Sequence, residues 1–374
     1  METKERIVFL DYLRIIACFM VMVVHSCEPF YLGGQGTLIL SRGDALWVTL
    51  IDGALRASVP LFVMVSSYLL FPIRGSVEDF FRKRAKRIVV PFIFWSVMYA
   101  FVPLYGSTYD FYNNDSLWQN FGNLWLNFVG AAGHLWFVYM LLGVYLIMPV
   151  FSAWVEKVSR RGEEWFIALW TFTTLIPFLR LAAQKIYGLP ELWGEANWNE
   201  FGMLYGVSGF IGFVVVGHYI RTYIGNLSWK KTLLCALPML LIGWAISAGY
   251  FWSVIPDEYP VDQPLQLAVE MERSWRFCGV GPALMAVGYF LIARKMNKGG
   301  WIYDKVVVSI SKASYGMYLM HIFFLCFFTV VIREQISCTP IAILSIALSS
   351  YITSFIVAKL ISLIPKIGKW IVGC

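Results

Sequence analysis

An arginine and a histidine, Arg14 and His25, lie with ten residues between them inside the first apolar segment of the chain. At about 100° per residue, the steps from one to the other make about three helical turns plus 20°, so both side chains lie on one helix face. That spacing is about 16 Å along the axis, roughly half a hydrocarbon core. An imidazole exchanges protons near neutral pH, and a guanidinium binds anions. Because an ion in a membrane helix costs about 2.5–3.5 kcal/mol, we expect this face to line a site rather than to contact lipid.

Four further polar side chains lie within or at the ends of other apolar segments: Asp52, Arg56, His134 and His321. Asp52 and Arg56 are spaced i, i+4 with the acid first, which is the favourable order for an ion pair on one helix. Such a pair suits a ligand site, but paired intramembrane charges also lock helices together. His134 is equally compatible with an interfacial side chain, and His321 with a hydrogen-bonded histidine of the core.

A run of basic residues from Arg82 to Arg87 directly precedes another apolar segment. Arginine binds phosphate through paired hydrogen bonds, so a polyanionic ligand would suit Lys83, Arg84 and Arg87 together with Arg14. By itself, the run is also the ordinary signal for a cytoplasmic loop.

The composition is that of an integral membrane protein. The chain is 59% hydrophobic and 14% charged, with a mean hydropathy of +0.66, whereas soluble domains are about 25% charged. The net charge of +7 is spread over alternate loops, which argues against nucleic acid as a partner. The seven cysteines show no CxxC spacing, and most fall within apolar segments, so we expect most of them to be small buried side chains. No bound metal is expected.

About ten apolar segments are long enough to span a bilayer, which predicts an all-α polytopic membrane protein. They are approximately 7–27, 46–71, 88–106, 133–152, 165–184, 201–222, 232–254, 274–293, 313–332 and 340–363. Most lysines and arginines lie in one set of alternate loops, so both termini are expected in the cytoplasm. No internal repeat or linker is visible, which indicates a single domain over residues 1–374 without a fused extracytoplasmic domain.

This orientation assigns a depth to each polar side chain. His25, Asp52, Arg56 and His134 are expected near the outer face. Arg14 and the basic run are expected on the cytoplasmic side, and His321 about two turns into its helix from that same side. Two unlike sites joined by one polar helix suggest a reaction carried across the membrane.

Five segments, in this order, resemble motifs of the acyltransferase-3 family of membrane O-acyltransferases. They are Leu10–Ala17 followed by His25, Ser58–Leu69, Arg84–Ile88 with Pro91, Gly133–Phe137, and Ser314–His321. The resemblance spans nearly the whole chain. Arg56 and the His-Leu-Trp-Phe segment resemble the stand-alone members that modify surface polysaccharides, of the enterobacterial common antigen O-acetyltransferase type. Ser67 stands where the family usually has glycine, a small residue for a small one.

The resemblance implies transfer of an acyl group, usually acetyl, from cytosolic acyl-CoA to a hydroxyl of an extracytoplasmic or lipid-linked glycan. It makes acetyl-CoA the donor substrate and His25 the catalytic residue, as a general base or a transient acyl carrier. The resemblance assigns binding of the donor to Arg14, Lys83, Arg84 and Arg87. It assigns a supporting role in catalysis, or binding of the acceptor, to Asp52, Arg56, His134, Trp136 and His321.

Two other classes remain open from the sequence. Ten helices with buried charges also suit a transporter or exporter of a surface glycan or its precursor, although no symmetry between two halves is visible. A non-catalytic scaffold for polysaccharide synthesis would use the polar stripe structurally. In each case we expect a multi-pass protein of a bacterial cytoplasmic membrane. Whether the chain forms a homo-oligomer or acts with a partner acyltransferase is left open by the sequence.

Overall fold

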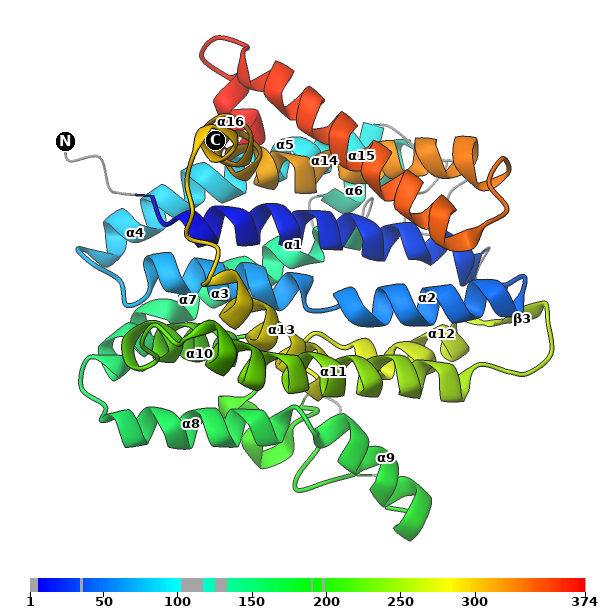
Figure 1. The fold of residues 1–374 in the computed structure, drawn as a ribbon, viewed down its shortest axis with the longest axis horizontal. Coiled ribbons are helices and arrows are strands. Elements are labelled where there is room, and N and C mark those ends of the chain that lie inside the picture. The colour runs from blue at the N-terminus through cyan, green and yellow to red at the C-terminus, as the bar shows by residue number, and fades with distance from the viewer. Residues whose placement is uncertain are drawn as a thin grey trace.

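The computed structural model describes residues 6–33, 36–101, 117–124, 133–189, 191–196 and 199–373, which form a bundle of helices with one small sheet (Figure 1). The helices are α1 (Val8–Cys27), α2 (Arg42–Leu55), α3 (Ser58–Leu70), α4 (Val77–Arg84), α5 (Val90–Phe101), α6 (Leu117–Leu124), α7 (Trp136–Val155), α8 (Arg160–Thr173), α9 (Ile176–Tyr187), α10 (Ile211–Tyr223), α11 (Trp229–Val254), α12 (Leu265–Met271), α13 (Val280–Ala293), α14 (Val308–Arg333), α15 (Thr339–Ser362) and α16 (Gly368–Val372). The strands are β1 (Leu32–Gly33), β2 (Gly36–Ile39) and β3 (Val261–Pro264).

The helices are those of a multi-pass membrane protein. Six stretches of the described chain are long and apolar enough to cross a bilayer: Val8–Phe30, Arg42–Leu70, Gly133–Val155, Trp229–Val254, Tyr303–Arg333 and Thr339–Ser362. The count rises to eight if each of two bent pairs, α8 with α9 and α12 with α13, forms one span. Of the other two expected segments, 88–106 runs past α5 into residues outside the described ranges, and 201–222 overlaps the shorter α10. The count of ten therefore stays a prediction.

The first helix lies in the middle of the bundle. α1 packs against α14 and α15 on one side and against α2 and α3 on the other, and these four helices lie above and below it in Figure 1. α11 packs on α2 and α13, and α8 packs on α10 farther out. Because neighbours surround α1, its polar stripe faces protein rather than lipid, as the cost of intramembrane ions requires.

One span is broken at the level where a charged side chain was expected. α2 ends at Leu55 and α3 begins at Ser58, so Arg56 lies in the turn between them. Pro60 has no backbone N–H to donate to the carbonyl of Arg56, and the helix resumes with the bond from Leu61 to Ala57. The proline thus explains why the chain turns at Arg56 within a spanning segment.

Ser67 allows the close helix contact expected of a small residue. Its hydroxyl donates to the carbonyl of Val214 at 2.6 Å, and a Cβ at Gly217 would lie 2.9 Å from its oxygen. α3 and α10 therefore approach closely through this pair, in the manner of small residues at membrane helix interfaces.

The described chain is mostly α-helical, as expected, and one feature was not predicted: a three-stranded antiparallel sheet joins two connecting segments. β2 pairs with β1 through Leu32 and Thr37, and with β3 through Thr37 and Gln263. Pairing between segments more than 200 residues apart leaves no mark in local periodicity. The sheet ties the chain that follows α1 to the chain that precedes α12, and both contribute to the site described next.

Candidate active site

α1 contributes a polar side chain to each of two cavities among the helices. The larger, about 350 Å³, is lined by His25, Glu28, Arg56, His134, Trp136 and Glu272, among others, and is called the histidine cavity. The smaller, about 180 Å³, is lined by Arg14, Arg84, Arg87 and Lys312, with apolar and hydroxyl side chains between them, and is called the basic cavity. The polar face of α1 therefore contributes His25 to the histidine cavity and Arg14 to the chemically different basic cavity.

Three of the four histidines of the chain lie close together, and two of them, His25 and His134, line the histidine cavity, whereas the buried His321 packs behind them. The ring centroid of His321 lies 5.3 Å from that of His25 and 5.1 Å from that of His134, and the His25 and His134 centroids are 6.4 Å apart. His25 belongs to α1, His321 to α14, and His134 to the 3-10 turn before α7. Among the described residues, no group of His, Cys, Asp and Glu converges closely enough to hold a metal ion.

The hydrogen bonds of two imidazoles define their orientation. Nδ1 of His25 lies 2.9 Å from Oε1 of Glu28, one helical turn further on. A carboxylate only accepts, so Nδ1 carries a proton, and in the neutral form of the ring Nε2 then has the lone pair. Nδ1 of His321 likewise donates to the carbonyl of Tyr318 at 2.6 Å. An imidazole whose Nδ1–H is held by an acceptor is oriented to use Nε2 as a base or nucleophile.

Asp52 and Arg56 form the ion pair that their spacing predicts. Nε and Nη2 of Arg56 donate to the two carboxylate oxygens at 2.5 and 2.7 Å. Asp52 is fully buried and is not among the residues that line the cavity, whereas Arg56 is. The carboxylate therefore holds the guanidinium at the cavity wall, and only Arg56 is placed to meet a ligand.

A second acid reaches the same guanidinium through a tyrosine. Nη2 of Arg56 lies 3.3 Å from the hydroxyl of Tyr31, which donates to Oε1 of Glu272 at 2.5 Å. The ring of Trp275 lies 4.3 Å from the guanidinium carbon, within cation–π range. Tyr31 follows α1 and Glu272 follows α12, so the sheet described above brings this network together.

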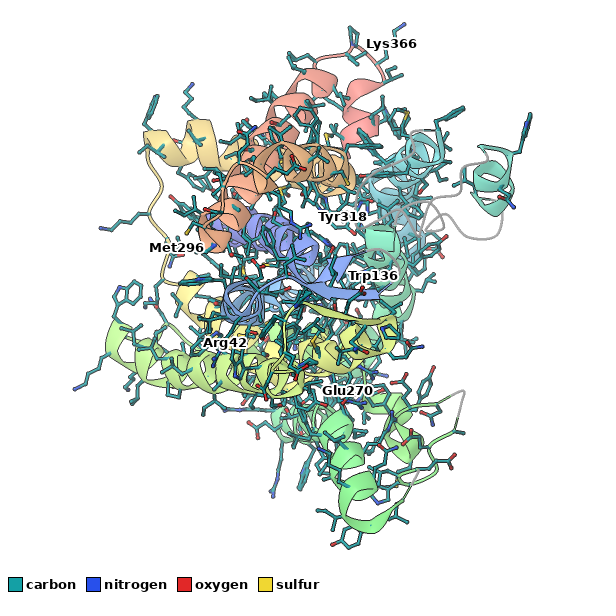
Figure 2. All side chains as sticks on the ribbon, turned by 90° about the vertical axis from the view of Figure 1, so that its right-hand side faces the viewer. Arg42, Trp136, Glu270, Met296, Tyr318 and Lys366 are labelled. Atoms are coloured by element: carbon teal, nitrogen blue, oxygen red, sulfur yellow. The ribbon has the colours of Figure 1, made fainter. Side chains whose placement is uncertain are left out.

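An aromatic face completes the histidine cavity. Trp136 at the start of α7 stacks on Phe277, with centroids 5.3 Å apart and ring planes 24° apart. Figure 2 looks onto this end of the molecule and shows Trp136 and Tyr318 near its centre, where both line the histidine cavity. Flat aromatic rings beside charged hydrogen-bonding groups suit a small polar ligand with an apolar face.

The basic cavity brings together three of the four predicted anion-binding residues. Arg14, Arg84 and Arg87 line it, whereas Lys83 is exposed and is not among its lining residues. Nε of Arg84 is buried without a hydrogen-bond partner in the described part of the chain. Burial lowers the pKa of the Arg84 guanidinium, which stays charged because arginine is so basic. A bound anion would compensate this desolvated charge.

Arg14 keeps a long ion-pair contact with Asp11, whose closer partners are other side chains. Asp11 accepts hydrogen bonds from Arg6 at 2.6 and 3.0 Å, and from Tyr303 and Ser311. Nη1 of Arg14 is 3.6 Å from the same carboxylate, the longest of these contacts. Asp11 thus fastens α1 to the start of the span that contains α14, and Arg14 reaches the cavity.

One predicted depth was wrong. His321 was expected on the same side as the basic run, but it contacts His25 and His134. The reason is that this span begins near Tyr303, about ten residues before the apolar pattern does, so His321 is well inside it. The remaining histidine, His218, lies against Glu163, away from the cluster.

Sequence reasoning missed Glu28, Tyr31 and Glu272. Glu28 was detectable, because an acid three residues after His25 shares its helix face. Glu272 could not be singled out among the acids of its loop, since the pairing of β2 with β3 sets its position.

Comparison with known proteins gives one match. A family model described as an acyltransferase domain matches residues 7–359, nearly the whole chain. No match came from the curated proteins or from the solved structures.

Proposed function

Because this chain belongs to the acyltransferase-3 family, we propose that it transfers an acetyl group from cytosolic acetyl-CoA to a glycan hydroxyl across the membrane. The observation that supports this proposal is the pair of unlike cavities on α1. One has four cationic side chains, and the other has an oriented imidazole beside aromatic and charged groups. A donor with several phosphates and an acceptor with many hydroxyls require these two chemistries.

The basic cavity is the donor side in this proposal. Arg14, Arg84 and Arg87 would bind the phosphates of coenzyme A, because guanidinium groups match phosphate oxygens through paired hydrogen bonds. We infer a cytoplasmic position for this end from the lysines and arginines of the flanking loops, which is where acetyl-CoA is found. Lys83 would contribute to the positive field around the mouth rather than to a direct contact.

The histidine cavity is the acceptor side. Nε2 of His25 would remove the proton from the sugar hydroxyl while the hydroxyl oxygen attacks the thioester carbon and the carbonyl electron pair moves onto oxygen. Collapse of this oxyanion breaks the carbon–sulfur bond, and the coenzyme A thiolate takes the proton back from His25. Glu28 would hold the required tautomer throughout, as the carboxylate of a catalytic triad does. The alternative, a transient acyl group on Nε2, uses the same orientation.

The remaining groups would bind the glycan. Arg56 and Glu272 offer a donor and an acceptor to sugar hydroxyls, and the Trp136 ring offers a flat face for the sugar ring. Asp52 would act only through Arg56. His134 would border the space around Nε2 of His25 and order the attacking hydroxyl, whereas His321, which packs against both rings without lining the cavity, would act only through them.

The test is mass spectrometry of surface glycans from cells with the wild-type chain, without it, and with His25→Asn. We expect one acetyl mass per modified unit in the first case only. His218→Asn is the matched control, because it removes a histidine outside the cluster, and it should retain the modification. An unchanged glycan in cells without the chain would contradict the function. Full modification with properly inserted His25→Asn would contradict the role of His25.

An exporter would give a different result. Purified chain in liposomes would then move a glycan precursor without any acyl-CoA. We expect no such transport, and we expect coenzyme A release that depends on the acceptor.

A further inference from the structure

Two aromatic residues line both cavities. Phe137, at the start of α7, and Tyr318, in the middle of α14, contribute to the wall of the histidine cavity and to that of the basic cavity. Their ring centroids are 5.2 Å apart with the ring planes at 70°. Each residue is only 6% exposed, and the two rings together form the partition that the cavities share.

This partition lies on the path that the proposed reaction needs. If coenzyme A is bound by Arg14, Arg84 and Arg87, its thioester must reach His25, which lines the cavity on the other side. The pantetheine arm then has to pass between or beside Phe137 and Tyr318. The thioester carbonyl is therefore held next to these two rings when it meets the base.

Only one of the two rings has a hydrogen-bond donor. The hydroxyl of Tyr318 donates to the backbone carbonyl of His134, and its ring lies 5.8 Å from the His134 ring and 5.7 Å from the His321 ring. The hydroxyl is thus at the histidine side of the partition, beside the cluster that contains His25. A phenol rotates about one bond and can exchange one acceptor for another.

We propose that Tyr318 is a further catalytic residue, whose hydroxyl leaves the His134 carbonyl and donates to the thioester oxygen at the partition. This inference rests on the proposed acyl transfer. As the sugar oxygen attacks, negative charge grows on the thioester oxygen, and the Tyr318 O–H stabilises it without giving up its proton. When the carbon–sulfur bond breaks, the carbonyl re-forms and the hydroxyl returns to His134. Phe137, on the other side, excludes water from the same carbonyl.

A donor aimed at a developing oxyanion in a dry site contributes mainly to the rate. Removing one such donor typically lowers kcat about 10²–10³-fold. Binding of the coenzyme A phosphates in the basic cavity is not affected, because Tyr318 does not contact them in this scheme. The KM for acetyl-CoA should therefore change little while kcat falls.

The test compares Tyr318→Phe with Tyr99→Phe in the full chain, purified into lipid nanodiscs. Tyr99 is a matched control, because its buried hydroxyl also donates to a backbone carbonyl, that of Leu319 at 3.0 Å, and its ring lies 5.1 Å from His134. It is not among the residues lining either cavity. The probes are acetyl-CoA and a glycan extract from cells that lack the chain, and the readout is coenzyme A release. We expect kcat to fall about 10²–10³-fold for Tyr318→Phe alone, with KM for acetyl-CoA unchanged in both variants.

Equal kcat values for the two variants would overturn the role of Tyr318. No acceptor-dependent release by the wild-type chain would instead contradict the proposed function, so the two failures are distinct. If Tyr318→Phe does not fold, the wild-type chain alone decides by infrared spectroscopy of bound acetyl-CoA labelled with ¹³C at the carbonyl. A shift of the carbonyl band to lower frequency supports a hydrogen bond to the thioester, and an unshifted band refutes it.

Discussion

Replacing Asp52 by alanine should destabilise the chain strongly, because it leaves the guanidinium of Arg56 in a buried place without its carboxylate. Asp52 is fully buried and Arg56 is 7% exposed, with two hydrogen bonds between them. Removing one partner of such a pair typically costs about 3–5 kcal/mol. Tyr31 and Glu272 stay close to Arg56 and compensate part of the lost charge, so we expect a loss near the lower limit. About 3 kcal/mol is roughly a 150-fold change in the unfolding equilibrium.

The double variant Asp52→Ala/Arg56→Met shows whether this loss comes from the stranded charge. Replacing both members of a buried ion pair by apolar groups is often neutral or stabilising, so the double variant should be more stable than Asp52→Ala alone. The assay is the free energy of unfolding by denaturant titration of the purified chain in one detergent. Glu164→Gln is the control, because it breaks the exposed Arg160–Glu164 pair and should cause no measurable change.

Two results would refute this reasoning. A loss below about 1 kcal/mol for Asp52→Ala would show that Arg56 is solvated or paired elsewhere. A double variant as unstable as the single one would show that packing around residue 52, rather than charge, carries the effect.

Three further outcomes follow from the two cavities. Arg84→Ala should raise the KM for acetyl-CoA about 10–100-fold, since a hydrogen bond to a charged group contributes about 1.5–3 kcal/mol. Replacing the exposed Lys83 by alanine should change this KM little, and equal effects of the two variants in a coenzyme A release assay would contradict the assignment of Arg84 to donor binding. Glu28→Gln should lower kcat by up to about 10²-fold with little change in the KM for acetyl-CoA, because His25 loses the carboxylate that fixes its tautomer. The loss is smaller than the whole contribution of general-base catalysis, which is about 10²–10⁴-fold, and an unchanged kcat would show that Glu28 does not orient the base. Phe137→Ala should cost about 3–5 kcal/mol of stability and allow acetyl-CoA hydrolysis without acceptor. Phe62→Ala removes a ring that lines the basic cavity only and should not increase hydrolysis. Increased hydrolysis in both variants, or in neither, would refute the role of Phe137 in the partition.

Local patterns in the sequence were informative wherever helix periodicity alone positions side chains. The Arg14–His25 stripe, the Asp52–Arg56 pair and the small residue at position 67 all appear as expected. Each depends on spacing within one helix or on the size of one side chain. The family motifs were informative for a related reason, since they record which local segments occur together and in what order.

The depth of His321 shows where that reasoning fails. An apolar window finds the hydrophobic part of a helix, but this span begins in a polar stretch near Tyr303 that includes Asp304 and Lys305. In the first turns of this span, the hydroxyls of Tyr303 and Ser311 donate hydrogen bonds to Asp11. In an isolated helix these hydroxyls would face lipid without a partner. The boundary, and with it the depth of the histidine, follows from those contacts.

The sequence by itself determined that this chain is a membrane protein with a polar first helix, and that His25 and Arg14 share one face of it. These properties follow from composition and from the 3.6-residue period. Only the tertiary structure decided that His134 and His321 meet His25, that Glu272 reaches Arg56 through Tyr31, and that Phe137 and Tyr318 separate the two cavities. The partners in these contacts lie on different helices and mostly more than a hundred residues apart, and no local period connects them. The packing of α7, α12 and α14 around the cavities sets their distances, and that packing turns a polar stripe into a candidate active site.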